Sequence, residues 1–160
     1  MSTKKQTLAI ITVIYENYTV LKDFLESLRN QTNKNFYLYI IDLSIHRHMI
    51  NNKGIAAKTI YADNKGYSFG VNTGLKKAID EGFEYFCIIN NDVYFKENFI
   101  ATDFKSMVDH PFSIIGGKIY YAGGYEYHKN RYKKSEMGKI LWYAGGKIDW
   151  NHGLTPHIGI

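Results

Sequence analysis

Residues 8–15 read Leu-Ala-Ile-Ile-Thr-Val-Ile-Tyr, a continuous run of apolar and β-branched side chains. A run without polar alternation is typical of a strand that is buried on both faces, as in a parallel sheet. Further short runs of this kind lie at 36–42, 58–62 and 86–90, and another begins at 114–115. The chain is therefore expected to build a mostly parallel sheet.

Apolar residues recur at helical spacing between these runs, over 20–28, 71–79 and 99–108. Thr19 and Ser68 stand where side chains that cap helix N-termini are favoured, and Gly82 stands where the second helix should end. Strands that alternate with helices predict an α/β fold, here a three-layer α/β/α sandwich.

The character of the sequence changes after Lys118. Residues 121–137 are rich in glycine, tyrosine and lysine and have weak periodicity, which indicates a long loop or a hairpin. We expect one domain over residues 1–160, with a core up to about residue 118 and a loop-rich part over about 119–160.

Charge, cysteine content and the length of the apolar runs limit the classes of protein to which this chain can belong. The formal net charge is +5 and the chain has one cysteine, Cys87, so no disulfide framework is expected. No run approaches the roughly 18 apolar residues of a membrane span, which favours a cytoplasmic protein that could still dock at the inner face of a membrane. The lysines are scattered, which argues against nucleic acid as a partner.

Polar side chains follow three of the predicted strands. Ligands gather at the carboxyl ends of strands in open α/β sheets, although Asn and Asp also serve as ordinary turn formers. Asp92 is the sharpest candidate, because a single carboxylate shared with a diphosphate commonly holds Mg²⁺. Asn90 could add a metal ligand, and Asp42 could accept hydrogen bonds from a pyrimidine or a ribose.

A glycine-containing segment, residues 63–74, precedes the second predicted helix. Its glycines would let the backbone approach a ligand, and a helix N-terminus favours anions. The segment is neither G-x-G-x-x-G nor a P-loop, which argues against a dinucleotide oxidoreductase and a P-loop ATPase.

Together these segments resemble family-2 glycosyltransferases of the GT-A fold, in particular a rhamnosyltransferase-like branch. The resemblance is carried by Val13-Ile14-Tyr15-Glu16-Asn17, by Ile41-Asp42-Leu43-Ser44, by the run from Asn64 to Gly74, and by Ile89-Asn90-Asn91-Asp92-Val93. The last resembles the family's metal-binding Asp-x-Asp.

The resemblance implies a nucleotide-diphosphate sugar donor carried by UDP, dTDP or GDP, a Mg²⁺ or Mn²⁺ cofactor, and a glycan or lipid-linked acceptor. It implies inverting transfer of a hexosyl or rhamnosyl unit in polysaccharide biosynthesis. Asp92 and Asn90 would hold the metal. The implied nucleotide-binding residues are Tyr15, Glu16, Asn17, Asp42, Asn64, Gly66, Gly70, Asn72 and Asn91.

The sequence departs from the family pattern in two places. Glu16 stands where the family favours asparagine, and no later Glu-Asp motif, which carries the family's catalytic base, precedes Ile160. We therefore expect a truncated chain with no assigned base that transfers poorly. A non-catalytic nucleotide- or sugar-binding module or partner subunit is the alternative, and an apolar surface facing the missing half would favour a homodimer.

Overall fold

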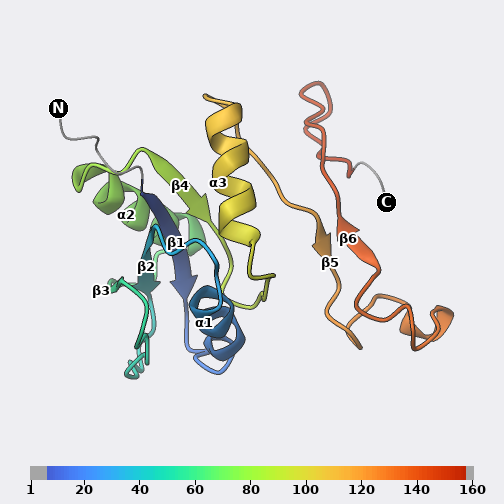
Figure 1. The fold of residues 1–160 in the computed structure, drawn as a ribbon, viewed down its shortest axis with the longest axis horizontal. Helices are drawn as coiled ribbons and strands as arrows, with labels where there is room; N and C mark the ends of the chain where they lie inside the picture. The colour runs from blue at the N-terminus through green and yellow to red at the C-terminus, as the bar shows by residue number, and fades with distance from the viewer. Residues whose placement is uncertain (1–6, 158–160) are drawn as a thin grey trace. The chain divides into compact units, whose positions relative to one another are not determined.

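A computed structural model describes residues 7–157 (Figure 1). The chain forms two compact units, one ending at Asp109 and the other beginning at His110. No helix in the described part of the chain is long and apolar enough to cross a membrane.

The first unit is built on a four-stranded parallel sheet with the strand order β3-β2-β1-β4. Its strands are β1 (Leu8–Ile14), β2 (Phe36–Asp42), β3 (Ala57–Tyr61) and β4 (Tyr85–Ile88). In the central strand β1 all residues except Val13 are buried, which confirms the expectation drawn from its apolar run.

Helices cover both faces of this sheet. One hydrophobic cluster joins β1 and β2 to α1 (Leu21–Arg29) and to Ile100 of α3 (Phe99–Asp109). The cluster on the opposite face includes Ala78 of α2 (Tyr67–Asp80). The predicted three-layer α/β/α sandwich is therefore confirmed, and Figure 1 shows the helices around the sheet.

Two glycines bring α2 close to the sheet. A Cβ on Gly74 would lie 2.6 Å from Cγ2 of Ile11, and one on Gly70 would lie 2.9 Å from Cγ1 of Val13. Side chains at these positions would push the helix away from β1. Gly70 and Gly74 thus have a structural role, which is to let α2 pack closely against the sheet.

Gly82 ends α2 as predicted. Its φ is 85°, its N–H donates to the Ile79 carbonyl, and the next residue, Phe83, donates to the Ala78 carbonyl. This pair of bonds is the Schellman arrangement, which favours glycine because the residue must adopt a left-handed conformation.

The two predicted N-caps were wrong. Val20 and Gly66 occupy the capping positions of α1 and α2, and neither forms a side-chain capping bond. Thr19 instead donates its hydroxyl to Oδ1 of Asn17, at 2.7 Å. Ser68 lies inside the first turn of α2, because the chain enters the helix through a turn in which the Asn64 side chain accepts the Gly66 N–H.

A buried amide side chain fixes the segment that leads into α3. Gln31, which is 2% exposed, donates through Nε2 to the carbonyls of Ser27 and Lys96 and accepts from the Ile100 N–H. The end of α1 and the start of α3 are therefore joined by one satisfied side chain.

The second unit contains a two-stranded antiparallel sheet of β5 (Ile119–Tyr120) and β6 (Leu141–Tyr143). The chain between them runs through turns and the short 3-10 helix η1 (Lys129–Arg131), so of the two predicted alternatives, a long loop or a hairpin, the structure shows an excursion between paired strands. The strand expected to begin at Ile114 and Ile115 was wrong: Ile114 is fully exposed, and pairing begins only at Ile119.

Candidate functional site

Parallel pairing brings the carboxyl ends of four strands to one edge of the first unit. Ile14, Asp42 and Tyr61 lie side by side in the register of β1, β2 and β3, and β4 pairs with the other side of β1. The segments that follow the strands carry the predicted site residues. The helix α2 also begins at this edge, because it follows β3 through a short connection.

One group of residues joins the start of α2 to the segment after β4. The Tyr67 hydroxyl donates to Oδ1 of Asn90 at 2.9 Å. Partial burial, together with the negative charge of Asp92, raises the pKa of Tyr67 above its ordinary value. Asp92 itself is exposed. We call Tyr67, Asn90 and Asp92 the β4–α2 end.

The turn that leads into α2 leaves its N-terminus open. Oδ1 of Asn64 accepts the Gly66 N–H at 3.0 Å, and Gly66 adopts a φ of 94° that favours glycine. The first turn of α2 carries neither an acidic residue nor a side-chain cap. The positive end of the helix dipole therefore lacks a partner side chain, and such an end attracts anions.

The ends of β1 and β2 are arranged differently. Asp42 is completely buried; its Oδ1 accepts the Ser44 N–H at 2.9 Å, and its Oδ2 accepts the Tyr18 hydroxyl at 2.8 Å. Oε1 of Glu16 accepts the N–H groups of Ile45 and His46. We call Glu16, Tyr18, Asp42 and Ser44 the β1–β2 end, where the protein itself satisfies both carboxylates.

Glu16 also has an unusual backbone. Its φ is 56°, and its own N–H donates to Oγ of Ser44 at 2.8 Å. The N–H of His46, which donates to its carboxylate, is the main cause that lowers the pKa of Glu16 below its ordinary value. Glu16 thus fixes the segment after β2, a role that the family pattern did not suggest.

The remaining predicted nucleotide-binding residues are spread along this edge. Tyr15 and Asn17 are exposed after β1, Asn91 is half-buried beside Asp92, and Asn72 is exposed one turn into α2. Gly70 is buried against Val13 and Leu43.

Exposed aromatic rings gather in the same segments. Tyr15, Tyr61, Tyr67 and Tyr94 are each 48% to 62% exposed. The Arg47 guanidinium lies 4.8 Å from the centre of the Tyr61 ring. Such rings suit stacking on bases or sugars, because they offer a large face and keep a polar tip.

Sequence reasoning missed Tyr18 and Tyr67 as members of the site. Tyr67 occupies the aromatic position of the glycine-containing motif, and that position was the available signal. Tyr18 lies 24 residues from Asp42 in sequence, and no local pattern predicts their hydrogen bond.

The donor set can be compared with the needs of a divalent metal. Within residues 7–157 no three His, Cys, Asp or Glu side chains form a group that could hold a metal ion. Mg²⁺ commonly uses one or two carboxylates and completes its shell with water and phosphate oxygens. Asp92 and Asn90 therefore fit a metal that is shared with a diphosphate and do not fit one that the protein holds alone.

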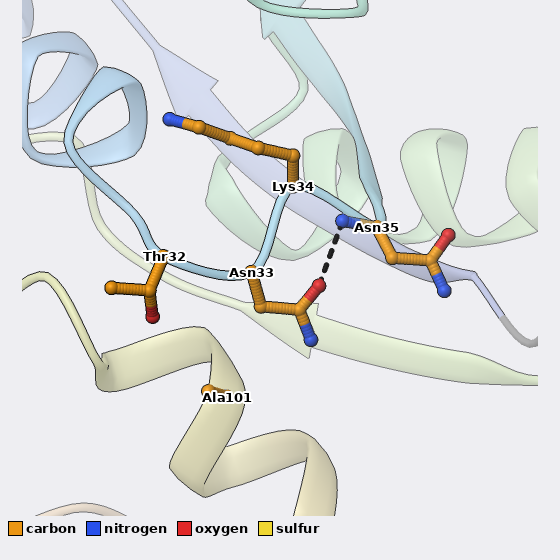
Figure 2. A pocket seen from close by; sticks show the side chains of 5 residues that line it. All are labelled: Thr32, Asn33, Lys34, Asn35 and Ala101. Atoms are coloured by element: carbon orange, nitrogen blue, oxygen red, sulfur yellow. Dashed lines mark hydrogen bonds between the residues drawn. The ribbon is translucent and has the colours of Figure 1, made fainter.

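A shallow depression of about 530 Å³ lies at the opposite edge of the sheet (Figure 2). Its lining residues are Thr32, Asn33, Lys34, Asn35 and Ala101. Oδ1 of Asn33 accepts the Asn35 N–H directly before β2 begins, so the length of β2 separates the depression from Asp42. Its lining is about equally polar and apolar, and none of the predicted site residues lines it.

Similar solved structures support the fold. A crystal structure of S. aureus TarS 1-349 matches with a TM-score of 0.56 at 14% identity, over 73% of this chain and 40% of that one. A crystal structure of S. aureus TarS matches with a TM-score of 0.55 at 14% identity, over 76% of this chain and 25% of that one. The chain thus spans less than half the length of either protein.

A comparison with curated proteins found no match. The family model described as glycosyl transferase family 2 matches residues 9–158, a range that begins in β1 and runs through both compact units. The match spans nearly the whole chain, and the chain belongs to glycosyl transferase family 2.

Proposed function

We propose that the carboxyl edge of the first unit binds the nucleotide-diphosphate part of a sugar donor, for inverting transfer to a glycan or lipid-linked acceptor. The observation that carries the proposal is the β4–α2 end. There the Tyr67 hydroxyl, in the uncapped first turn of α2, donates to Asn90, and the exposed carboxylate of Asp92 is near enough to help raise the pKa of Tyr67.

A diphosphate needs positive charge, and three features of this edge supply it. The helix N-terminus contributes a partial positive charge. Lys65 lies 5.3 Å from the ring centre of Phe69 and Arg47 lies against Tyr61, so two cations flank the turn into α2. Mg²⁺ or Mn²⁺ would be held by Asp92 and Asn90 and, when bound, would neutralise charge on the leaving diphosphate.

The nucleoside would occupy the neighbouring segments. Tyr15 offers a half-exposed ring for the base, and Asn17, Asn64, Gly66, Asn72 and Asn91 lie in the segments that would line the nucleotide cleft. Asp42 is completely buried, so it would contact base or ribose only after a local rearrangement has exposed its carboxylate. The proposal concerns donor binding and assigns no general base; the rhamnosyl or hexosyl identity of the sugar stays a prediction.

Calorimetric titration of UDP, dTDP and GDP, with and without Mn²⁺, tests the proposal. We expect one nucleotide to bind in a metal-dependent manner and Asp92→Asn to abolish that binding. Asp80→Asn removes an exposed carboxylate elsewhere on α2 and is the matched control. Binding that ignores both the metal and Asp92 would refute the proposed site.

A turnover assay with the matching nucleotide sugar separates the two functions that the sequence left open. Release of nucleotide with transfer to an acceptor supports the transferase. Metal-dependent binding without turnover, even at high protein concentration, supports a binding module or partner subunit instead.

A further inference from the structure

The excursion between β5 and β6 is a closed and ordered loop. The Glu126 carboxylate, only 4% exposed, accepts the Gly124 N–H through Oε2 at 2.8 Å and the Gly138 N–H through Oε1 at 2.5 Å. The Tyr121 N–H donates to the Ile140 carbonyl just outside this clasp. One buried side chain thus ties both ends of residues 124–138 together, as in an Ω-loop, and such loops are frequently functional.

The acidic and the basic side chains of this loop have different surroundings. Both acids of the loop accept backbone N–H groups: Glu126 does so in the clasp, and Oε2 of Glu136 accepts the Lys133 N–H at 2.7 Å. The cations Arg131, Lys133 and Lys134 are exposed, and none of them forms an ion pair with another described residue. The outer surface of the loop is therefore strongly basic.

Aromatic rings accompany these cations. Tyr125 is 81% exposed and Tyr127 is 70% exposed, and the ring of Tyr127 lies 4.1 Å from that of His128. Tyrosine is enriched where a protein meets the boundary between lipid headgroups and hydrocarbon, and nearby Lys and Arg are attracted by anionic lipids.

We propose that residues 124–138 form a docking surface for an anionic lipid membrane. The tyrosines would enter the headgroup layer while Arg131, Lys133 and Lys134 contact lipid phosphates and carboxylates. Nucleic acid is the less favoured partner, because such binding needs cations that follow a strand along a groove, whereas these cations lie within one short loop. The proposal does not depend on the proposed donor site.

Co-sedimentation of the full chain with vesicles tests the proposal. The probes are phosphatidylcholine vesicles with and without one third of phosphatidylserine. We expect binding only to the anionic vesicles and a decrease with added salt. Lys133→Gln combined with Lys134→Gln should lower the partition coefficient about 25-fold, since each basic residue near an anionic surface contributes about fivefold.

Two matched variants keep the test specific. Lys22→Gln combined with Lys105→Gln removes the same charge from exposed positions on α1 and α3 and should leave vesicle binding nearly unchanged. Tyr125→Ser combined with Tyr127→Ser should weaken the binding that remains at high salt, where charge attraction is screened. Circular dichroism melting of each variant confirms that the chain still folds.

Three results would overturn the proposal. The first is that the wild-type chain ignores anionic vesicles. The second is that the α1 and α3 lysine variant loses as much binding as the loop variant, which would indicate a general effect of net charge. The third is that single-stranded RNA displaces the vesicles and binds the tyrosine variant unchanged.

Discussion

The β1–β2 end and the β4–α2 end lie at the same edge of one sheet, and each contains an aspartate near the carboxyl end of a strand. Asp42 is completely buried with both oxygens bonded, whereas Asp92 is exposed beside one tyrosine and one asparagine. A carboxylate that the protein has already satisfied stabilises the fold, and one left open can bind a ligand. Two aspartates near the carboxyl ends of neighbouring parts of the sheet therefore have different roles.

The largest expected effect is that of Asp42→Ala on stability. Removing the buried carboxylate leaves the Ser44 N–H without its acceptor and the Tyr18 hydroxyl with only the longer bond to the His46 carbonyl, which should lower the free energy of unfolding by about 3 kcal/mol. Urea denaturation followed by circular dichroism measures this. Asp92→Ala is the paired variant and should change stability by less than about 0.5 kcal/mol. Equal losses in the two variants would remove the distinction between the two ends.

A smaller effect on stability is expected from a substitution that pushes α2 away from the sheet. In Gly74→Ala the added methyl group meets Ile11 and Ile41 on the sheet, and the misfit should cost about 2 kcal/mol. Because α2 carries Tyr67, nucleotide affinity should fall as well, while the bonds of Asp42 are untouched. Gly117→Ala, whose methyl group would enter open space, is the control. A Gly74→Ala protein with wild-type stability and affinity would show that the close approach is unimportant.

The smallest expected effect is the contribution of Glu16 to the pH dependence of stability. Its folded pKa lies below the ordinary 4.5, mainly because the His46 N–H donates to the carboxylate. The stability that this interaction contributes is present above the ordinary pKa and is lost as pH falls through the lowered folded pKa.

Glu16→Gln should therefore melt slightly below wild type near neutral pH, and the two melting temperatures should converge in acid. Glu26→Gln, at an exposed position on α1, is the comparison. Curves for Glu16→Gln that stay parallel to wild type down to strongly acidic pH would contradict this account of Glu16.

Sequence reasoning succeeded where local pattern decides the structure. The apolar run of β1, the Schellman end at Gly82 and the strand-to-helix alternation each follow from neighbouring residues, and together they gave the sandwich. The placement of Asn90 and Asp92 at the carboxyl edge followed from the same argument, because parallel strands end together.

Sequence reasoning failed where residues that are distant in the sequence decide the structure. The burial of Asp42 depends on Tyr18 and Ser44, and Ile114 and Ile115 form no strand because pairing with β6 selects Ile119 and Tyr120 instead. The predicted cap at Ser68 failed for a related reason: the Asn64 side chain fixes the turn into α2, and Ser68 lies inside the helix instead of before it.

Gln31 has a consequence for the order in which this protein assembles during synthesis. Its side chain bonds to Lys96 and Ile100, which lie 65 and 69 residues further along the chain. Contacts over such separations form late, because the entropy of closing the loop must be lost before any bond compensates for it. A nascent chain can thus form β1, α1 and β2 before Lys96 and Ile100 have been synthesised, so the Gln31 side chain gains its full set of partners only after α3 has joined the fold.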